Sequence, residues 1–134
     1  MHTLTMRRAL AIGTVLIATA AANGQTERRV IKVNAERFAF TPSRIELIAG
    51  EAVDLRLRSD DTSHGFRIMG LDTNVAIPKR GKGDITVTLT IDKPGTYRFE
   101  CNRMCGAGHD FMRGEIVVRE RTAAAPSPRH EERR

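Results

Sequence analysis

Residues 85–101 read ITVTLTIDKPGTYRFEC, and this stretch gives the clearest structural signal in the 134-residue chain. Its first seven residues alternate strictly between apolar side chains and threonine, as expected for a strand with one buried face. Pro94 and Gly95 follow in the positions that a type II turn favours. The alternation then resumes at Tyr97, Phe99 and Cys101. The stretch therefore predicts two half-buried strands joined by a tight turn.

Similar short segments lie on both sides of this pair of strands. Apolar-rich or alternating runs occur at residues 30–34, 38–41, 45–47, 53–57, 66–68 and 116–118. No segment between residues 29 and 120 has a helical period, and the sequence contains no internal repeat. Short strands separated by regular turn signals favour a sandwich or a barrel. We therefore predict one all-β domain over residues 29–120, which is long enough to bury a core without disulfide bonds.

The N-terminal segment, residues 1–24, has the pattern of an export signal. Arg7 and Arg8 precede an unbroken apolar run over residues 9–22, which ends in three alanines. A basic start, an apolar run and small residues at its end are typical of a cleaved signal peptide. A short membrane anchor is the alternative, but a spanning helix needs about 20 apolar residues. We therefore expect a periplasmic or secreted protein, with anchoring through this segment as the second reading.

The C-terminal segment, residues 121–134, is rich in Ala, Pro and Ser and then strongly charged, so we expect a disordered tail.

The distribution of charge predicts no nucleic-acid partner. Both termini contribute to the formal net charge of +6, whereas basic and acidic residues are interspersed in the central region. Nucleic-acid binding would require a clustered basic face or a recognisable motif, and the sequence shows neither.

A loop between two of the predicted strands contains four side chains that bind soft metals. Residues 101–112 read CNRMCGAGHDFM, with Cys101, Cys105, His109 and Met112 as donors. Thiolate and thioether groups select Cu(I), and imidazole also suits copper. Two glycines in the loop allow the tight turns that such a convergence needs. The loop therefore predicts a copper site.

His64 supplies a second imidazole from a distant part of the chain, at the start of a predicted strand. A mononuclear cupredoxin centre uses two His, one Cys and a weak axial Met, which would leave one cysteine surplus. Two thiolates spaced by three residues can instead bridge two copper ions, each with one His. Met112 would then cap one ion and a backbone carbonyl the other.

Two further interpretations of the cysteines are a disulfide and a zinc site. An oxidising compartment favours a disulfide, and three intervening residues allow one. Two Cys and two His could also bind zinc tetrahedrally, but Met112 would then have no role. His2 and His130 lie in the N-terminal segment and in the tail, so we do not expect them to be ligands.

These residues together resemble the CuA domain of cytochrome c oxidase subunit II, and the similar domain of nitrous oxide reductase. The family pattern is a distant His followed by Cys-x-x-x-Cys-Gly-x-x-His-x-x-Met. The chain matches this pattern at His64, Cys101, Cys105, Gly106, His109 and Met112. The likeness covers about residues 30–119. It implies a cupredoxin-like Greek-key β-sandwich with two copper ions, and it implies that the backbone carbonyl of Arg103 is a further ligand.

The resemblance also implies a function and partners. It suggests a periplasmic electron-transfer protein that accepts electrons from a small redox protein such as a c-type cytochrome. A terminal oxidase or a reductase would be the acceptor, and we expect no catalysis by this chain alone. The alternatives are a periplasmic protein for Cu(I) delivery or storage, and an accessory CuA subunit of a membrane-bound oxidase. The chain departs from the oxidase subunits at Arg103, where they usually carry a magnesium-binding Glu, and it contains no Trp.

Overall fold

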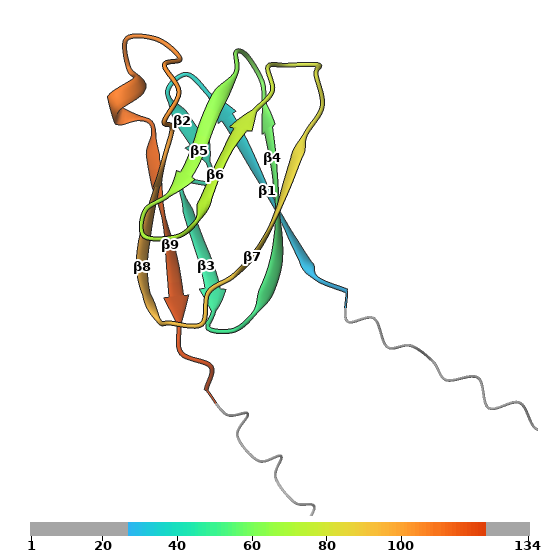
Figure 1. Cartoon of the computed structure of the whole chain (residues 1–134), viewed down its shortest axis with the longest axis vertical. Helices are drawn as coiled ribbons and strands as arrows, with labels where there is room; N and C mark the ends of the chain where they lie inside the picture. Colours follow the sequence, from blue (N-terminus) through green and yellow to red (C-terminus); the bar gives the residue numbers. More distant parts are fainter. Residues whose placement is uncertain (1–26, 123–134) are drawn as a thin grey trace, which may run out of the picture.

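The computed structural model describes residues 27–122, in which nine strands and one short 3-10 helix follow one another (Figure 1). The predicted export segment, residues 1–24, and nearly all of the predicted tail lie outside the described residues. The elements are β1 (Arg29–Glu36), β2 (Ala39–Thr41), β3 (Arg44–Ile48), β4 (Ala52–Ser59), β5 (His64–Ile68), β6 (Thr73–Ile77), β7 (Ile85–Thr90), β8 (Gly95–Glu100), η1 (His109–Phe111) and β9 (Arg113–Arg119).

The strands form two sheets packed face to face. One sheet has the order β2-β1-β4-β7, and the other has the order β3-β9-β8-β5-β6. β1 pairs with β4 and β3 pairs with β9 in parallel, whereas the remaining pairs are antiparallel. The chain passes repeatedly from one sheet to the other, as the colours in Figure 1 show. The predicted all-β sandwich is therefore confirmed.

The core lies between the sheets and follows from the alternation in the sequence. In β4, for example, Val53, Leu55 and Leu57 point inward and are fully buried. Phe40 of β2 packs edge-on against two rings of the opposite sheet, with centroids 5.7 Å from Phe66 and 5.3 Å from Phe99. These three rings join the sheets directly beneath the end of the sandwich that carries the predicted ligands.

Strand direction brings the predicted ligands to one end of the sandwich. β5 begins at His64, and β8, its antiparallel neighbour, ends next to Cys101. The Cys101 amide donates to the Met112 carbonyl at 2.9 Å, which closes the β8–β9 loop at its base. Four connections therefore meet at this end: β1–β2, β4–β5, β6–β7 and β8–β9 (Figure 1). We call it the ligand end.

Two elements differ from the sequence-based expectation. β6 (Thr73–Ile77) was not expected as a separate strand, and only its last residue is buried. The β8–β9 loop contains η1, a single helical turn that is too short to give a periodic signal. Among residues 27–122, no helix has the length and apolar character needed to cross a membrane.

Candidate metal centre

His64 is completely buried at the start of β5, and each of its ring nitrogens has a different neighbour. Nε2 lies 2.7 Å from the Asp61 carboxylate, which can only accept a hydrogen bond when ionised. Nε2 therefore carries the proton, and Nδ1 keeps a free lone pair. This Nδ1 atom faces the Cys101 sulfur at 4.0 Å. A histidine oriented in this way by a carboxylate is a common arrangement for a metal ligand.

The β4–β5 turn places Asp61 beside His64. The Ser59 hydroxyl donates to the Thr62 carbonyl and accepts a hydrogen bond from the Asp61 amide. Burial opposes ionisation of Asp61, but hydrogen bonds from His64, the Arg37 amide and Thr62 outweigh it and hold the pKa of this carboxyl below its usual range. Asp61 is therefore a carboxylate at neutral pH and a steady acceptor for His64.

The two cysteines are free, buried and close together. Their sulfur atoms are 3.8 Å apart, and the Gly65 amide donates to the Cys101 sulfur at 3.3 Å. Burial, together with the neighbouring Cys101, raises the pKa of the Cys105 thiol to about 11. The thiol is therefore protonated at neutral pH in the absence of metal, and a bound cation must displace its proton.

The remaining predicted donors surround these two sulfurs. His109 Nδ1 lies 3.7 Å from the Cys105 sulfur, and the Met112 sulfur lies 3.8 Å from it. The Arg103 carbonyl oxygen lies 3.1 Å from the Cys101 sulfur. Met112 is 1% exposed, whereas His109 is only half-buried. The structure thus brings all six predicted residues to one place, and the reactive atoms of His64, Cys101 and Cys105 lie within 4.8 Å of one another.

This donor set fits copper. Two thiols, two imidazoles and a thioether are soft or intermediate ligands, and the buried thioether beside Cys105 has no part in a zinc site. Four of the six residues, His64, Cys101, Cys105 and Met112, are buried, which would also keep water away from a bound ion.

The sequence did not identify three residues that support the loop. Arg37 donates from Nε to the Cys105 carbonyl at 2.7 Å and from its amide to Asp61 at 3.0 Å. The Phe38 ring lies so close to Gly106 and Gly108 that a Cβ atom would come within 2.9 Å and 2.3 Å of it. Asp61 stands three residues before His64, a spacing that could have indicated its role.

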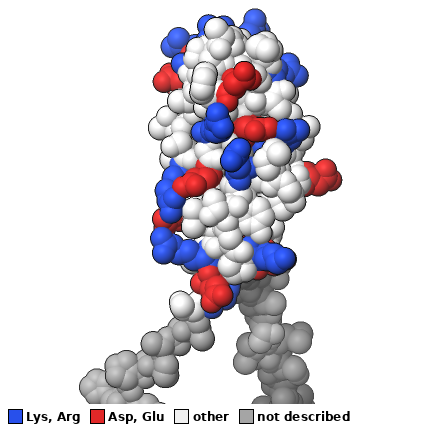
Figure 2. Space-filling view, turned by 90° about the vertical axis from the view of Figure 1, so that its left-hand side faces the viewer, with Lys and Arg blue, Asp and Glu red and all other residues white. Residues whose placement is uncertain are grey.

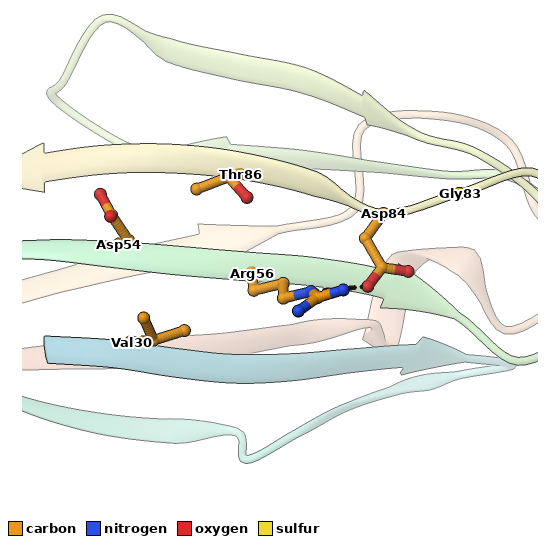
Figure 3. Close-up of a pocket in the computed structure, with 6 residues that line it drawn as sticks. All are labelled: Val30, Asp54, Arg56, Gly83, Asp84 and Thr86. Atoms are coloured by element: carbon orange, nitrogen blue, oxygen red, sulfur yellow. Dashed lines mark hydrogen bonds and ion pairs between the residues drawn. The ribbon is translucent and has the colours of Figure 1, made fainter.

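A surface hollow of about 480 Å³ lies away from the metal centre, on the outer face of the β2-β1-β4-β7 sheet (Figure 3). Arg56 points along this face toward Asp84 and pairs with it at 2.7 Å. Asp54 accepts hydrogen bonds from Thr88 and Arg28. Its charged groups already have partners within the protein, so this face gives no indication of a ligand.

Comparison with known proteins agrees with this geometry. The family described as Cupredoxin-like domain matches residues 8–118, and the chain belongs to this family. Two cytochrome c oxidase subunit 2 sequences of Thermus thermophilus are each 38% identical to it over 91 residues, or 67% of this chain. The matches span 65% and 52% of those subunits, so the chain corresponds to part of their length.

Solved structures show the same fold. The periplasmic domain of subunit II of cytochrome oxidase from Bradyrhizobium japonicum gives a TM-score of 0.62 at 14% identity, covering 69% of this chain and 84% of that one. The blue copper protein auracyanin A of Chloroflexus aurantiacus gives 0.55 at 17% identity, covering 69% and 100%. A chain of a heme-copper terminal oxidase dimer gives 0.58 at 25% identity, covering 82% and 78%. The predicted cupredoxin-like fold and the resemblance to the CuA domain of subunit II are therefore confirmed.

Proposed function

We propose that this chain transfers single electrons through a centre of two copper ions outside the cytoplasm. The ligands would be the side chains of His64, Cys101, Cys105, His109 and Met112 and the carbonyl of Arg103. Copper supplies one-electron redox chemistry when bound. The observation that carries the proposal is the pair of sulfurs 3.8 Å apart, each with an imidazole Nδ1 of its own at 4.0 Å or 3.7 Å. A mononuclear centre has no use for the second cysteine.

The protein residues hold the ligands in place before metal arrives. Asp61 fixes the orientation of His64, and Arg37 fixes the backbone at Cys105. Ligands held by a rigid frame need little rearrangement when the charge of the site changes. His109 is the one imidazole of the site that is partly exposed, so a redox group on another protein can come closest to the site there.

The partners follow from the relatives. The similarity to subunit 2 of cytochrome c oxidase supports a terminal oxidase as the electron acceptor and a periplasmic location. A small redox protein, such as a c-type cytochrome, would be the donor. Arg103 differs from the Glu usual in oxidase subunits, but this leaves the carbonyl ligand intact, because the backbone is unchanged.

Copper stoichiometry together with electron paramagnetic resonance tests this function. We expect two coppers per chain, with the unpaired electron of the oxidised protein shared equally between them. The Cys105→Ser variant should retain one copper and lose the shared signal. One copper per wild-type chain, or an unshared spin, would overturn the dinuclear proposal. Rapid loss of copper to an acceptor protein, without a stable oxidised state, would favour copper delivery instead.

A further inference from the structure

The ligand end has an apolar centre. Met104 and Phe111 are 77% and 74% exposed, more than any other large hydrophobic side chain of residues 27–122. Both lie in the β8–β9 loop, and Phe111 closes the helical turn that begins at His109. Exposed apolar patches rimmed by polar residues are typical of interaction sites. We call this pair the apolar cap.

Exposed basic side chains lie at the same end of the sandwich as the apolar cap. Five exposed residues form this basic rim: Lys79, Arg80 and Lys82 of the β6–β7 connection, and Arg103 and Arg113 of the β8–β9 loop and its end. None of the five forms an ion pair within residues 27–122. The Arg80 amide binds the Asp61 carbonyl at 3.1 Å, which places the β6–β7 connection beside the centre.

Three acidic residues of the ligand end are neutralised by their own neighbours, whereas the exposed Glu36 and Asp110 form no ion pair within residues 27–122. Asp60 pairs with Arg58, Asp84 pairs with Arg56, and Asp61 contacts His64. Figure 2 shows the result: Lys and Arg predominate along the upper rim around a pale top, whereas blue and red side chains alternate lower down.

The opposite end has a different charge arrangement. Arg29 pairs there with Glu51, and Arg119 pairs with Glu46. Lys93 and Arg121 form no ion pair within residues 27–122, but their sequence neighbours Asp92 and Glu120 are equally unpaired and exposed. The excess of unpaired cations over unpaired carboxylates is therefore found at the end where His109 reaches the surface.

We propose that the apolar cap and the basic rim form the docking surface for an acidic one-electron redox protein. Carboxylates on the partner would complement cations that have no partner in this chain, which speeds encounter and fixes orientation. The apolar cap supplies the desolvated centre that interfaces need. One electron leaves the partner, which is oxidised, and the copper centre is reduced, without any bond being formed or broken. The inference rests on the proposed electron-transfer function.

The dependence of the electron-transfer rate on salt tests the polarity of this surface. Reduced c-type cytochromes of opposite net charge, one acidic and one basic, are mixed with the copper-loaded full chain in a stopped-flow instrument. Salt screens attraction and repulsion alike. We expect the rate with the acidic cytochrome to fall as salt rises, and the rate with the basic cytochrome to rise.

A charge-reversal pair locates the surface. Lys79→Glu/Lys82→Glu should lower the rate with the acidic cytochrome at low salt by roughly tenfold, because steering depends on local charge. The matched control, Lys32→Glu/Lys93→Glu, makes the same change in net charge on the face of β1 and in the β7–β8 turn. We expect it to lower the rate far less.

Binding gives a readout that does not depend on electron transfer. Titrating the labelled, reduced chain with the acidic cytochrome should shift the NMR signals of Met104, Phe111 and residues 79–82. Three outcomes would overturn the docking surface while the copper spectrum stays intact. They are a salt dependence opposite to the one expected, equal losses of rate in the two charge-reversal pairs, and NMR shifts confined to other parts of the protein. A chain that binds no copper would contradict the proposed function instead, and the same titration on that chain would still decide the docking surface.

Discussion

The two ring nitrogens of His64 show how one residue can be prepared for metal. Nε2 is held by Asp61 at 2.7 Å, and Nδ1 is free to face Cys101. Without the carboxylate, the ring could turn or adopt the other tautomer, and each change would remove the Nδ1 lone pair from the site. The loss of such an outer partner typically lowers metal affinity about 10–100-fold.

We therefore predict that Asp61→Ala weakens copper binding by about 10–100-fold and alters the visible spectrum of the bound metal. Competition with a copper chelator measures the affinity. Asp60→Ala is the matched control, because Asp60 pairs with Arg58 and does not contact the centre. Equal affinities for the two variants would show that Asp61 has no positioning role.

Single residues also show which parts of the site can be predicted from the sequence. Five of the six predicted ligands were recognisable because each side chain has a distinctive donor atom and a characteristic spacing, whereas the Arg103 carbonyl was implied only by the family resemblance. Arg37 and Phe38 were not, because they act through shape and a backbone hydrogen bond, across 68 residues in the case of Arg37 and Cys105. Their contribution depends on contact between the β1–β2 connection and the β8–β9 loop, and no local sequence pattern predicts that two distant loops are in contact.

Among the strands, β9 depends on a glycine that leaves room for its neighbours. A Cβ atom at Gly114 would lie 2.3 Å from the Phe99 ring and 2.4 Å from the Ser43 carbonyl. Neither neighbour can move freely, since the ring is fully buried and the carbonyl accepts the Glu115 amide. We predict that Gly114→Ala destabilises the fold by about 1–3 kcal/mol or more.

Chemical denaturation of the two proteins measures this change. Thr96→Ala, on the exposed face of neighbouring β8, is the control and should change the free energy of unfolding by about 0.5 kcal/mol or less. A Gly114→Ala protein as stable as the wild type would mean that the strands adjust more easily than the packing suggests.

The strands differ in how well the sequence predicts them. β4 and β7 have strict alternation because one face of each packs on the core. β6 was not predicted because it is an edge strand with a single buried residue, so its sequence lacks a clear alternation of apolar and polar side chains. Pairing order was also beyond the sequence pattern, since alternation shows which face is buried but not which strand lies alongside.

Across the whole molecule, the three phenylalanine rings beneath the ligand end hold the sheets together. Phe40 is 2% exposed and is the only one of the three that comes from the β2-β1-β4-β7 sheet. We predict that Phe40→Ala costs about 3–5 kcal/mol in the free energy of unfolding, because it leaves a cavity between the layers. Phe111→Ala is the control and should cost about 0.5 kcal/mol or less, because that ring is 74% exposed. Similar losses for both variants would contradict a core held by this contact.

The distribution of charge also predicts how stability responds to acid. Glu51, in the turn opposite the ligand end, accepts hydrogen bonds from Arg29 and from the Ile48 amide. The Arg29 hydrogen bond, opposed by burial and assisted by the Ile48 amide, holds the pKa of Glu51 below its ordinary value of 4.5. The ionised form is thus favoured in the folded protein. Its stabilisation is present above pH 4.5 and is lost as the pH falls through the lower folded pKa.

We therefore predict that Glu51→Gln is less stable than the wild type at neutral pH, by less than about 1 kcal/mol, because the ion pair is partly exposed. The difference should shrink toward zero in the most acidic buffer in which both proteins stay folded. Denaturation in urea at the two pH values measures it, with Glu120→Gln as a control that removes an exposed carboxylate without an ion pair in residues 27–122. If the stability difference between the two proteins stayed the same in acid, protonating Glu51 would have had no effect on the wild type. The charge of Glu51 would then not stabilise the fold, and its shape and hydrogen bonds would account for the difference.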